Sequence, residues 1–561
     1  MNPKDPRTQT LRPHGVYAIH GLSVADETLV AVDSLRGYLV SVNPQNDDTR
    51  VLNSHNASDF VGAAGLCVEG ETLWFTRGDT VYFCALNDFN VRRFLTLPYA
   101  VQGIAVCGSA LYVCCHKEGL IYVFNRETGR EITRFYAPGV GVENLAIRGE
   151  ELWVSDSIEQ TVYCMDRGTG SILFSVLTPF ASPTALTFHT PPDWEGPDGE
   201  TSSLLYVAYA MEEPYIRDDP NSANPYQLTF RDRTFIHPLH IYQNREKHYT
   251  LSNGYLVEMS YVEELSPLDA VELEGIEWHI ALPVDTPRQT VKQIEPVGMP
   301  FETRTIHEQP MAVFQFDKLK PFESGVFGWK ALLELRGIKY HFKPRDVEDL
   351  PELPIEYRER YLIDDDNLAM DTETVQRAAR NAIGTEANLL RQVLSIRDYV
   401  YDRLEYGIKP HIDTPDIVLK RGMGSCGEYV GILLALLRLN GIACRTVGRY
   451  KCPDRAEYRE AAMQPDFNHV WLEFYIPGYG WIPMESNPDD MNDRGPHPLR
   501  FFMGLAWYHV ELVKGVKFES LMRNGERIPK PEVSLGDLAI NHVRFRILEE
   551  LLPLEEDEAK G

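Results

Sequence analysis

An imperfect repeat in the first 210 residues constrains most strongly how this chain can fold. Its copies share alternating apolar residues, a turn that contains glycine in the clearest cases, and a leucine that begins the next apolar run. They occupy residues 21–32, 65–75, 103–113, 144–154 and, in degenerate form, 186–207. The equivalent leucines of the first four copies, spaced by 44, 38 and 41 residues, are Leu29, Leu73, Leu111 and Leu152. A period near 40 residues predicts a small structural unit repeated along the chain.

Each copy has the pattern of short β-strands. Leu66 and Val68 alternate with polar neighbours, a turn follows at Gly70, and Leu73 opens the next strand. Four strands per 40 residues is typical of a β-propeller blade, and such a blade cannot bury both faces alone. The pattern resembles NHL- or YVTN-type propellers with about five blades. It predicts an all-β propeller-like repeat domain over residues 1–240.

The hydrophobic period changes after this region. Longer alternating segments predict a β-sandwich over residues 241–345. An acidic stretch rich in proline, residues 346–374, follows as a linker or a wrapping loop. Residues 375–530 contain amphipathic helices and then strands, which predicts an α+β core, and residues 531–561 are expected to form a C-terminal tail. The chain is therefore expected to be multidomain.

Charge and cysteine content exclude several classes of function. The formal net charge is −27, which disfavours nucleic acid and membrane surfaces as partners. The longest apolar run, residues 429–437, is too short to cross a bilayer. An odd count of nine cysteines without an export signal predicts reduced thiols and a cytoplasmic location. Neither a CxxC pair nor an HExxH motif is present, so no metal or other cofactor is expected.

Cys426 is the strongest candidate for a reactive group. It lies in a glycine-rich segment, residues 421–428, directly before an apolar helix for which Ser425 is a plausible N-cap. The N-terminus of a helix favours the thiolate, and its unpaired N–H groups could bind an oxyanion. Cysteines on the predicted repeat strands, by contrast, are expected to be small buried apolar residues.

A histidine and a carboxylate complete a possible triad. His469 opens a strand, a turn follows at residues 477–480, and a return strand ends near Glu485. Histidine is the usual base for such a thiol, and a carboxylate on the return strand could orient the imidazole.

The C-terminal third resembles the transglutaminase-like core, a papain-like thiol fold. Three blocks carry the resemblance: residues 397–406, residues 424–445 around Cys426, and residues 469–485. The resemblance covers about residues 375–520 and implies that the catalytic Cys, His and acid are Cys426, His469 and Glu485. The preceding sandwich also resembles the β-domain that often precedes this core in bacterial proteins.

The acid departs from the family pattern, in which it is usually aspartate. Asp489 and Asp490 lie close in sequence and are the alternatives to Glu485. With a turn centred on residues 478–479, Leu472 would lie opposite Glu485, so that His469 would be roughly 10 Å farther along at ordinary strand rise. A bulge or twist near Pro483 would be needed to bring Glu485 to His469.

The resemblance implies a cysteine-dependent enzyme that forms a thioester on Cys426. Hydrolysis of a protein or peptide amide is favoured over cross-linking, since no calcium-loop signature is present. The alternative is an inactive core that acts with the propeller as a protein-interaction module. The expected partners are a protein or peptide substrate and, on the propeller, a possible protein partner.

Overall fold

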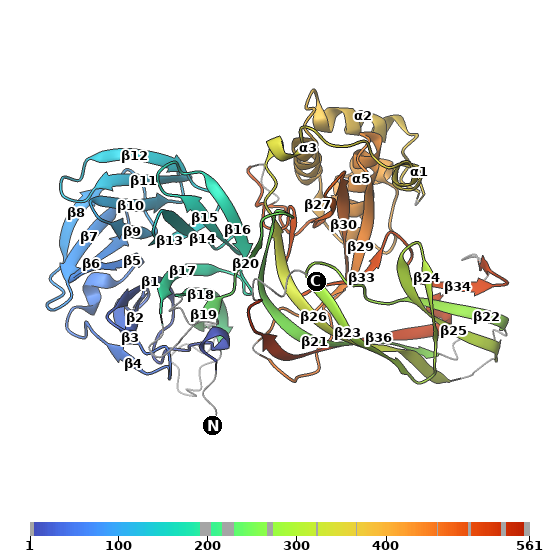
Figure 1. Ribbon diagram of the computed structural model, residues 1–561, viewed down its shortest axis with the longest axis horizontal. Helices are drawn as coiled ribbons and strands as arrows, with labels where there is room; N and C mark the ends of the chain where they lie inside the picture. The colour runs from blue at the N-terminus through green and yellow to red at the C-terminus, as the bar shows by residue number, and fades with distance from the viewer. Residues whose placement is uncertain are drawn as a thin grey trace.

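The computed structural model describes residues 5–190, 203–215, 229–265, 273–320, 324–365, 367–456, 458–491, 495–528 and 535–554. Its N-terminal part consists of five antiparallel sheets, four of them with four strands and the fifth with three (Figure 1). The first two sheets contain β1 (Ile19–Ala25), β2 (Thr28–Asp33), β3 (Tyr38–Val42) and β4 (Thr49–Val51), then β5 (Ala63–Glu69), β6 (Thr72–Arg77), β7 (Thr80–Ala85) and β8 (Arg92–Thr96). The next two contain β9 (Ile104–Cys107), β10 (Ala110–Cys115), β11 (Leu120–Asn125) and β12 (Glu131–Tyr136), then β13 (Val142–Arg148), β14 (Glu151–Asp156), β15 (Thr161–Asp166) and β16 (Ile172–Leu177). The fifth contains β17 (Pro183–His189), β18 (Leu204–Tyr215) and β19 (Thr229–Leu239).

These five sheets follow one another around a ring. The strands β1, β5, β9, β13 and β17 contact their neighbours in that order, and β17 contacts β1. A separate apolar cluster fills each of the five interfaces between consecutive sheets. Within β2, for example, Leu29 packs toward the fifth sheet whereas Val30 packs toward the second. The alternation therefore buries both faces of a sheet, as the repeat requires, and is consistent with the predicted propeller-like arrangement.

The N-terminal segment completes the fifth sheet. Leu11 and Ile236 of β19 exchange backbone hydrogen bonds of 2.8 and 2.9 Å. The start of the chain thus pairs with the last sheet of the ring, which covers an edge that would otherwise be open.

Two larger sheets follow and share one apolar core. The first contains β20 (Tyr242–Asn244), β21 (Tyr249–Leu265), β23 (Gln289–Val297), β26 (Gly325–Tyr340), β32 (Gly504–Leu505) and β36 (Ala539–Leu551). The second contains β22 (Leu273–Ala281), β24 (Glu302–Ile306), β25 (Gln309–Leu319), β34 (Glu519–Arg523) and β35 (Glu526–Arg527). The inward residues of β21 include the fully buried Val257 and Met259, and those of β22 include Trp278.

The C-terminal segment differs from the expected tail. β36 pairs with β21 along its whole length, from Leu265↔Ala539 to Gly254↔Leu551. Phe545 and Ile547 are buried in the shared core, while Arg544 and Arg546 point away from it. This period-two alternation is that of a strand with one covered face, and the acidic residues beyond it obscured the pattern in the sequence.

The α+β part places helices over a four-stranded sheet of order β31-β30-β29-β33 (Figure 1). The strands are β29 (Cys444–Lys451), β30 (Asn468–Ile476), β31 (Gly480–Met484) and β33 (His509–Lys514), and a short parallel pair is formed by β27 (Glu405–Tyr406) and β28 (Met423–Gly424). The helices of this part are α1 (Ile355–Tyr361), α2 (Glu373–Ile383), α3 (Leu389–Tyr401), α4 (Pro415–Arg421) and α5 (Cys426–Leu439). A further one-turn helix, α6 (Leu535–Leu538), directly precedes β36. Three 3-10 turns are η1 (Pro6–Thr8), η2 (Ala57–Phe60) and η3 (Pro344–Val347). The central helix α5 is apolar on nearly all sides because it packs against α2, α3 and the sheet.

The acidic stretch before this core wraps against it. Tyr361 in α1 is 3% exposed, and its ring lies 4.8 Å from that of Trp481. Asp365 pairs with Arg438 of α5. Residues 355–365 thus contact the α+β part through Tyr361 and Asp365.

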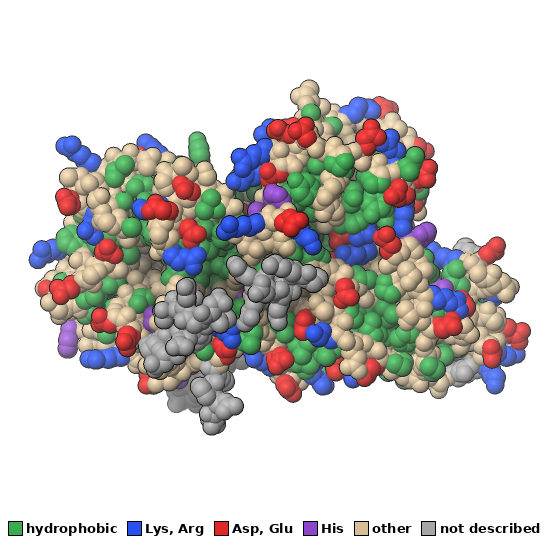
Figure 2. Space-filling model, viewed as in Figure 1, with side chains coloured by type: hydrophobic (Ala, Val, Ile, Leu, Met, Phe, Trp, Pro, Cys, Tyr) green, Lys and Arg blue, Asp and Glu red, His purple; other side chains and the backbone are tan. Residues whose placement is uncertain are grey.

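The ring is docked on the rest of the molecule by polar contacts. Trp507 donates its Nε1–H to the carbonyl of Pro179 at 2.9 Å, and Thr250 donates its hydroxyl to Ser175 at 2.6 Å. His237 of β19 lies 2.8 Å from Glu550 of β36. Acidic and basic side chains are interspersed over the face seen in Figure 2. None of the helices in the described ranges combines the length and apolarity that a bilayer crossing requires.

Candidate active site

The start of α5 is held by a capping box. Glu428 accepts the Ser425 N–H at 2.8 Å, the Asp413 N–H at 3.0 Å and a hydrogen bond from Arg421 at 2.7 Å. Burial acts to raise the pKa of Glu428, but these N–H groups and the arginine outweigh it and lower the pKa. Glu428 therefore stays ionised and fastens the glycine-rich approach to Cys426, the first residue of the helix.

Cys426 is half-buried and lies next to His469. Burial acts to raise the pKa of the Cys426 thiol, whereas the His469 side chain lowers it, and the net shift is downward. For His469, burial acts to lower the pKa, but the charge of Glu485 raises it. Both shifts favour a thiolate–imidazolium pair.

Glu485 is the carboxylate that holds His469. Its two oxygens lie 3.0 and 2.8 Å from Nε2 of His469, and both side chains are almost fully buried. Nδ1 of His469 has no hydrogen-bond partner among the described residues, so it is the ring nitrogen left for the thiol. Asp489 instead accepts the Phe501 N–H at 2.8 Å and pairs with Arg500 at 3.0 Å.

The hairpin register explains how Glu485 reaches His469. The prediction placed Leu472 opposite Glu485, but Leu472 pairs with Met484 because the turn contains the three residues 477–479. Gly478 adopts a φ of +87° in this turn, and Pro477 has no N–H for a ladder bond. β31 then ends, and Glu485 donates its N–H to Phe501 at 3.1 Å. The side chain is thereby free of the ladder and turned toward His469.

Two neighbours of Glu485 were missed in the sequence. Nε2 of His509, the first residue of β33, lies 2.6 Å from the carboxylate, and Lys451, the last residue of β29, forms an ion pair with it. Burial lowers the pKa of His509 to about 3, so this ring is neutral near pH 7. Burial acts to raise the pKa of Glu485, but His469 and Lys451 bring it well below its usual range. Neither neighbour lies in a recognisable sequence motif, because strand pairing between β29 and β33 brings both residues to Glu485.

Two aromatic side chains flank the reactive pair. Tyr406 is 42% exposed on β27, which pairs with β28 just before Cys426. Burial, followed by the charge of Cys426, raises the pKa of Tyr406, which places the phenol near the thiol. The exposed Phe467 lies 6.0 Å from the His469 ring. Both rings are available to contact a substrate.

The other thiols differ from Cys426. Burial raises the pKa of Cys84, Cys114, Cys164 and Cys444 to about 12. These side chains are unreactive apolar residues, as expected. Within the described residues, no group of three His, Cys, Asp or Glu side chains is arranged to hold a metal ion.

Residues 376–486 match the family model described as the Transglutaminase-like superfamily. The chain therefore carries a transglutaminase-like domain, a domain of a thiol-enzyme family, which confirms the resemblance predicted from the sequence. The match contains Cys426, His469 and Glu485.

Solved structures share only low overall similarity with the chain. A protein from Cytophaga hutchinsonii described as a "putative cysteine protease" is 17% identical, with 55% of this chain and 96% of that chain covered and a TM-score of 0.37. Glutaminyl cyclase of Myxococcus xanthus is 11% identical, with 41% and 95% covered and a TM-score of 0.28. Virginiamycin B lyase of Staphylococcus aureus is 15% identical, with 36% and 66% covered and a TM-score of 0.24. No curated protein matches the chain.

Proposed function

We propose that this protein is a cysteine-dependent enzyme that hydrolyses an amide bond of a protein or peptide. The observation that carries the proposal is the connected set of Cys426, His469 and Glu485. The thiol pKa is lowered beside an imidazole whose other nitrogen lies 2.8 Å from a buried carboxylate. A structural cysteine would have its pKa raised by burial, as Cys114 and Cys444 do.

The geometry supports the following steps. His469 takes the proton of Cys426 at Nδ1, and the thiolate attacks the carbonyl carbon of the substrate amide. The N–H groups at the start of α5 stabilise the oxyanion because they have no partner within the helix. The imidazolium then gives its proton to the leaving amine, and a thioester remains on Cys426. His469 deprotonates water, which attacks the thioester and releases the acid.

Glu485 supports this cycle through His469. It holds the imidazole in the tautomer that presents Nδ1 to the thiol, and its negative charge stabilises the imidazolium. Lys451 and His509 in turn hold Glu485 in one orientation. The acid is therefore a positioning residue rather than a group that touches substrate.

We also propose the domain organisation within which this site works. Residues 1–240 form a five-bladed propeller-like unit, supported by the five filled interfaces around the ring. Residues 241–345 provide most of a sandwich to which strands β34–β36 are added, and residues 375–530 contain the catalytic core. The propeller serves as a platform for protein substrate.

Thiol labelling tests the enzyme proposal directly. Limited alkylation with iodoacetamide followed by peptide mapping is expected to modify Cys426 first among the nine cysteines. The matched variant His469→Gln should slow labelling at Cys426 and leave the other sites unchanged. Preferential labelling elsewhere, with Cys426 silent in the native chain, would favour the alternative of an inactive interaction module.

Peptide pools that contain glutamine or asparagine test whether water or an amine accepts the acyl group from the thioester. The reaction is run with and without a primary amine. Hydrolysis yields the free acid and ammonia in both cases, whereas cross-linking yields the amine adduct. We expect the free acid, and Cys426→Ala should abolish it. Predominant amine adduct would overturn the preference for hydrolysis while retaining the thioester.

A further inference from the structure

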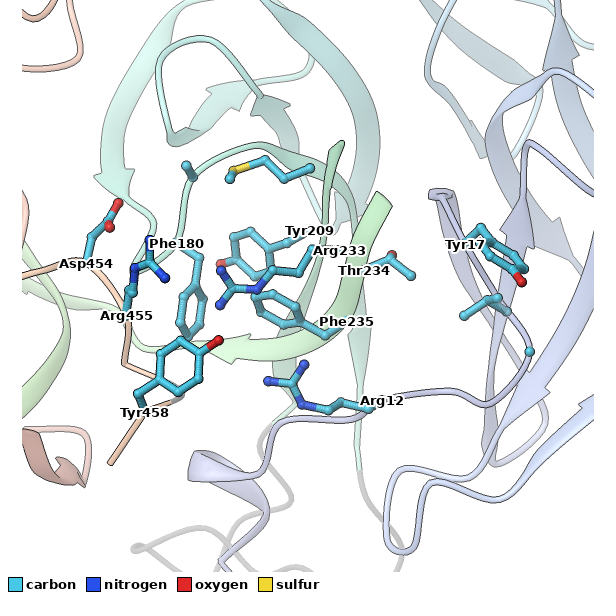
Figure 3. Close-up of a pocket in the computed structure, with 14 residues that line it drawn as sticks. Arg12, Tyr17, Phe180, Tyr209, Arg233, Thr234, Phe235, Asp454, Arg455 and Tyr458 are labelled. Carbon is cyan, nitrogen blue, oxygen red and sulfur yellow. The ribbon is translucent and has the colours of Figure 1, made fainter. Parts of the chain in front are cut away.

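A large cavity lies where the ring meets the catalytic core. Its volume is about 740 Å³, within the range of ligand-binding pockets. Three parts of the chain line it: the N-terminal segment with Arg12, strands β18 and β19 with Arg233 and Phe235, and the core segment with Arg455 and Tyr458 (Figure 3). The cavity therefore exists only in the docked molecule.

Cationic and aromatic groups alternate on its wall. The guanidinium of Arg12 lies 5.2 Å and that of Arg233 lies 5.9 Å from the centre of the Phe235 ring. The guanidinium of Arg455 lies 6.0 Å from the Tyr458 ring, and Tyr458 is 52% exposed. Figure 3 shows the three arginines gathered around the aromatic rings. Such a wall suits a ligand that combines negative charge with a planar group.

Several of the acidic groups at and beside this wall already have partners. Asp454 is the one carboxylate among the described lining residues of the cavity. An adjoining hollow shares Arg12 and contains Asp5, Asp47 and Glu550. Asp5 pairs with Arg7 at 2.7 Å and Glu550 is engaged by His237 at 2.8 Å, while Asp47 accepts the backbone N–H of Arg12 at 3.3 Å. In a chain with a formal charge of −27, Arg12 and Arg455 bring positive charge to this wall. Their field favours an anionic ligand at this place.

The cavity is close to the candidate active site along the chain. Lys451 forms an ion pair with Glu485. Arg455 follows Lys451 by four residues, so the Cα atoms of Lys451 and Arg455 are at most roughly 14 Å apart. A smaller hollow of about 180 Å³ is lined by Lys451, Asp454 and Phe467 and shares Asp454 with the cavity. Phe467 lies beside His469. An extended peptide of four or five residues spans the distance between Lys451 and Arg455.

We propose that this cavity is a second binding site that takes an acidic, aromatic-containing segment of the protein substrate a few residues from the amide attacked by Cys426. The proposal rests on the proposed hydrolase function for the identity of the ligand. Carboxylates of the segment pair with Arg12 and Arg455, and its aromatic side chain packs on Phe235. A nucleic acid fits less well, because its extended charge would meet the acidic surface beyond the cavity.

Fluorescence anisotropy on the full-length Cys426→Ala variant tests the site without turnover. The probe is a fluorescein-labelled peptide of sequence Glu-Glu-Tyr-Glu-Asp flanked by glycines, and its matched control replaces every acid with the corresponding amide. We expect the acidic peptide to bind at least ten-fold more tightly than the control. Adding Arg12→Gln and Arg455→Gln together should weaken its binding at least ten-fold, which is about 1.4 kcal/mol.

Both arginines are exposed, so their replacement should not unfold the chain, and a melting curve checks this. The control variant Arg93→Gln removes an exposed arginine from β8, outside the cavity, and should leave binding unchanged. Equal binding of both peptides, no measurable binding, or unchanged binding by the double variant would overturn the proposal. Tighter binding of an oligonucleotide of equal charge would overturn it as well.

The outcome is separable from that of the hydrolase proposal. If the acidic peptide binds through the arginines but the native chain hydrolyses no amide, the hydrolase proposal is wrong. The acidic-peptide site would then still stand. If amide hydrolysis is equally fast on acidic and neutral peptides and does not depend on the two arginines, the binding-site proposal is wrong. The hydrolase proposal would then still stand.

Discussion

Two buried carboxylates in this protein are each held by histidine, one in the candidate active site and one at the junction between the ring and the first large sheet. Glu485 lies 2.8 Å from Nε2 of His469, and Glu550 lies 2.8 Å from Nε2 of His237. Each carboxylate has further partners, and each has its pKa lowered: burial acts to raise it, and the facing histidine together with the other partners outweighs burial.

The difference lies at the other nitrogen of each ring. Nδ1 of His237 is 2.9 Å from the hydroxyl of Thr10, so both of its nitrogens are satisfied by the fold. Nδ1 of His469 has no such partner among the described residues, and the Cys426 thiol lies beside the ring. A buried Glu–His pair can therefore serve stability alone. It can also take part in catalysis where the second ring nitrogen faces a nucleophile.

The largest expected effect comes from removing the thiol. Cys426→Ala should lower kcat by roughly 10⁵-fold or more, because no thioester can form. The melting temperature should change little, since the side chain is half-buried and its contacts are few. Peptide hydrolysis and thermal unfolding measure the two effects. Retained turnover would remove Cys426 from the mechanism.

The next effect distinguishes the two carboxylates. Glu485→Gln should lower kcat by roughly 10³- to 10⁴-fold, because His469 loses its tautomer and its charge partner. Glu550→Gln should leave kcat within about three-fold and lower the melting temperature, because His237 loses a buried partner. Parallel kinetics and melting curves make the comparison.

Asp489→Asn sharpens the assignment of the acid. Asp489 holds Phe501 and Arg500 rather than His469, so kcat should fall less than in Glu485→Gln. The opposite ranking would transfer the orienting role to Asp489. Equal, small losses for both variants would contradict the triad.

A smaller effect concerns the pH dependence of thiol labelling. Because the pKa of Cys426 is lowered, its thiolate and its alkylation rate should persist at pH values below the ordinary thiol range. His469→Gln removes the group that lowers this pKa, so the midpoint should move to higher pH. One pH unit of movement slows labelling at pH 7 about ten-fold. An unchanged profile would separate His469 from the thiol.

The smallest expected effect comes from Lys451. Its charge lowers the pKa of His469, so Lys451→Met should raise that pKa and move the basic limb of the kcat/KM profile to higher pH. kcat at pH 7 should stay within about three-fold. Lys420→Met, an exposed lysine on α4, is the matched control and should move neither limb. A shift toward lower pH would contradict the assigned sign.

Local sequence patterns predicted many of the strands, the helix that carries Cys426 and the candidate site residues. The spacing of Leu29, Leu73, Leu111 and Leu152 indicated repeated strands, and the structure has a sheet at each of these positions. The helix expected from Ser425 begins at Cys426, with Ser425 as its N-cap. The candidate thiol, histidine and acid were all proposed from three sequence blocks. These features depend on turns, helix caps and the alternation of apolar and polar residues within about ten residues. Such local patterns can be recognised in the sequence itself.

The sequence by itself thus determined the repeated strands, the helix that carries Cys426 and the residues that form the candidate triad. The tertiary structure alone decided that β36 joins the first large sheet, that Lys451 and His509 hold Glu485, and that Arg12 and Arg455 line one cavity. The physical reason is that these contacts join residues brought together by strand pairing and docking, and register between distant strands depends on the whole packed core rather than on local propensity.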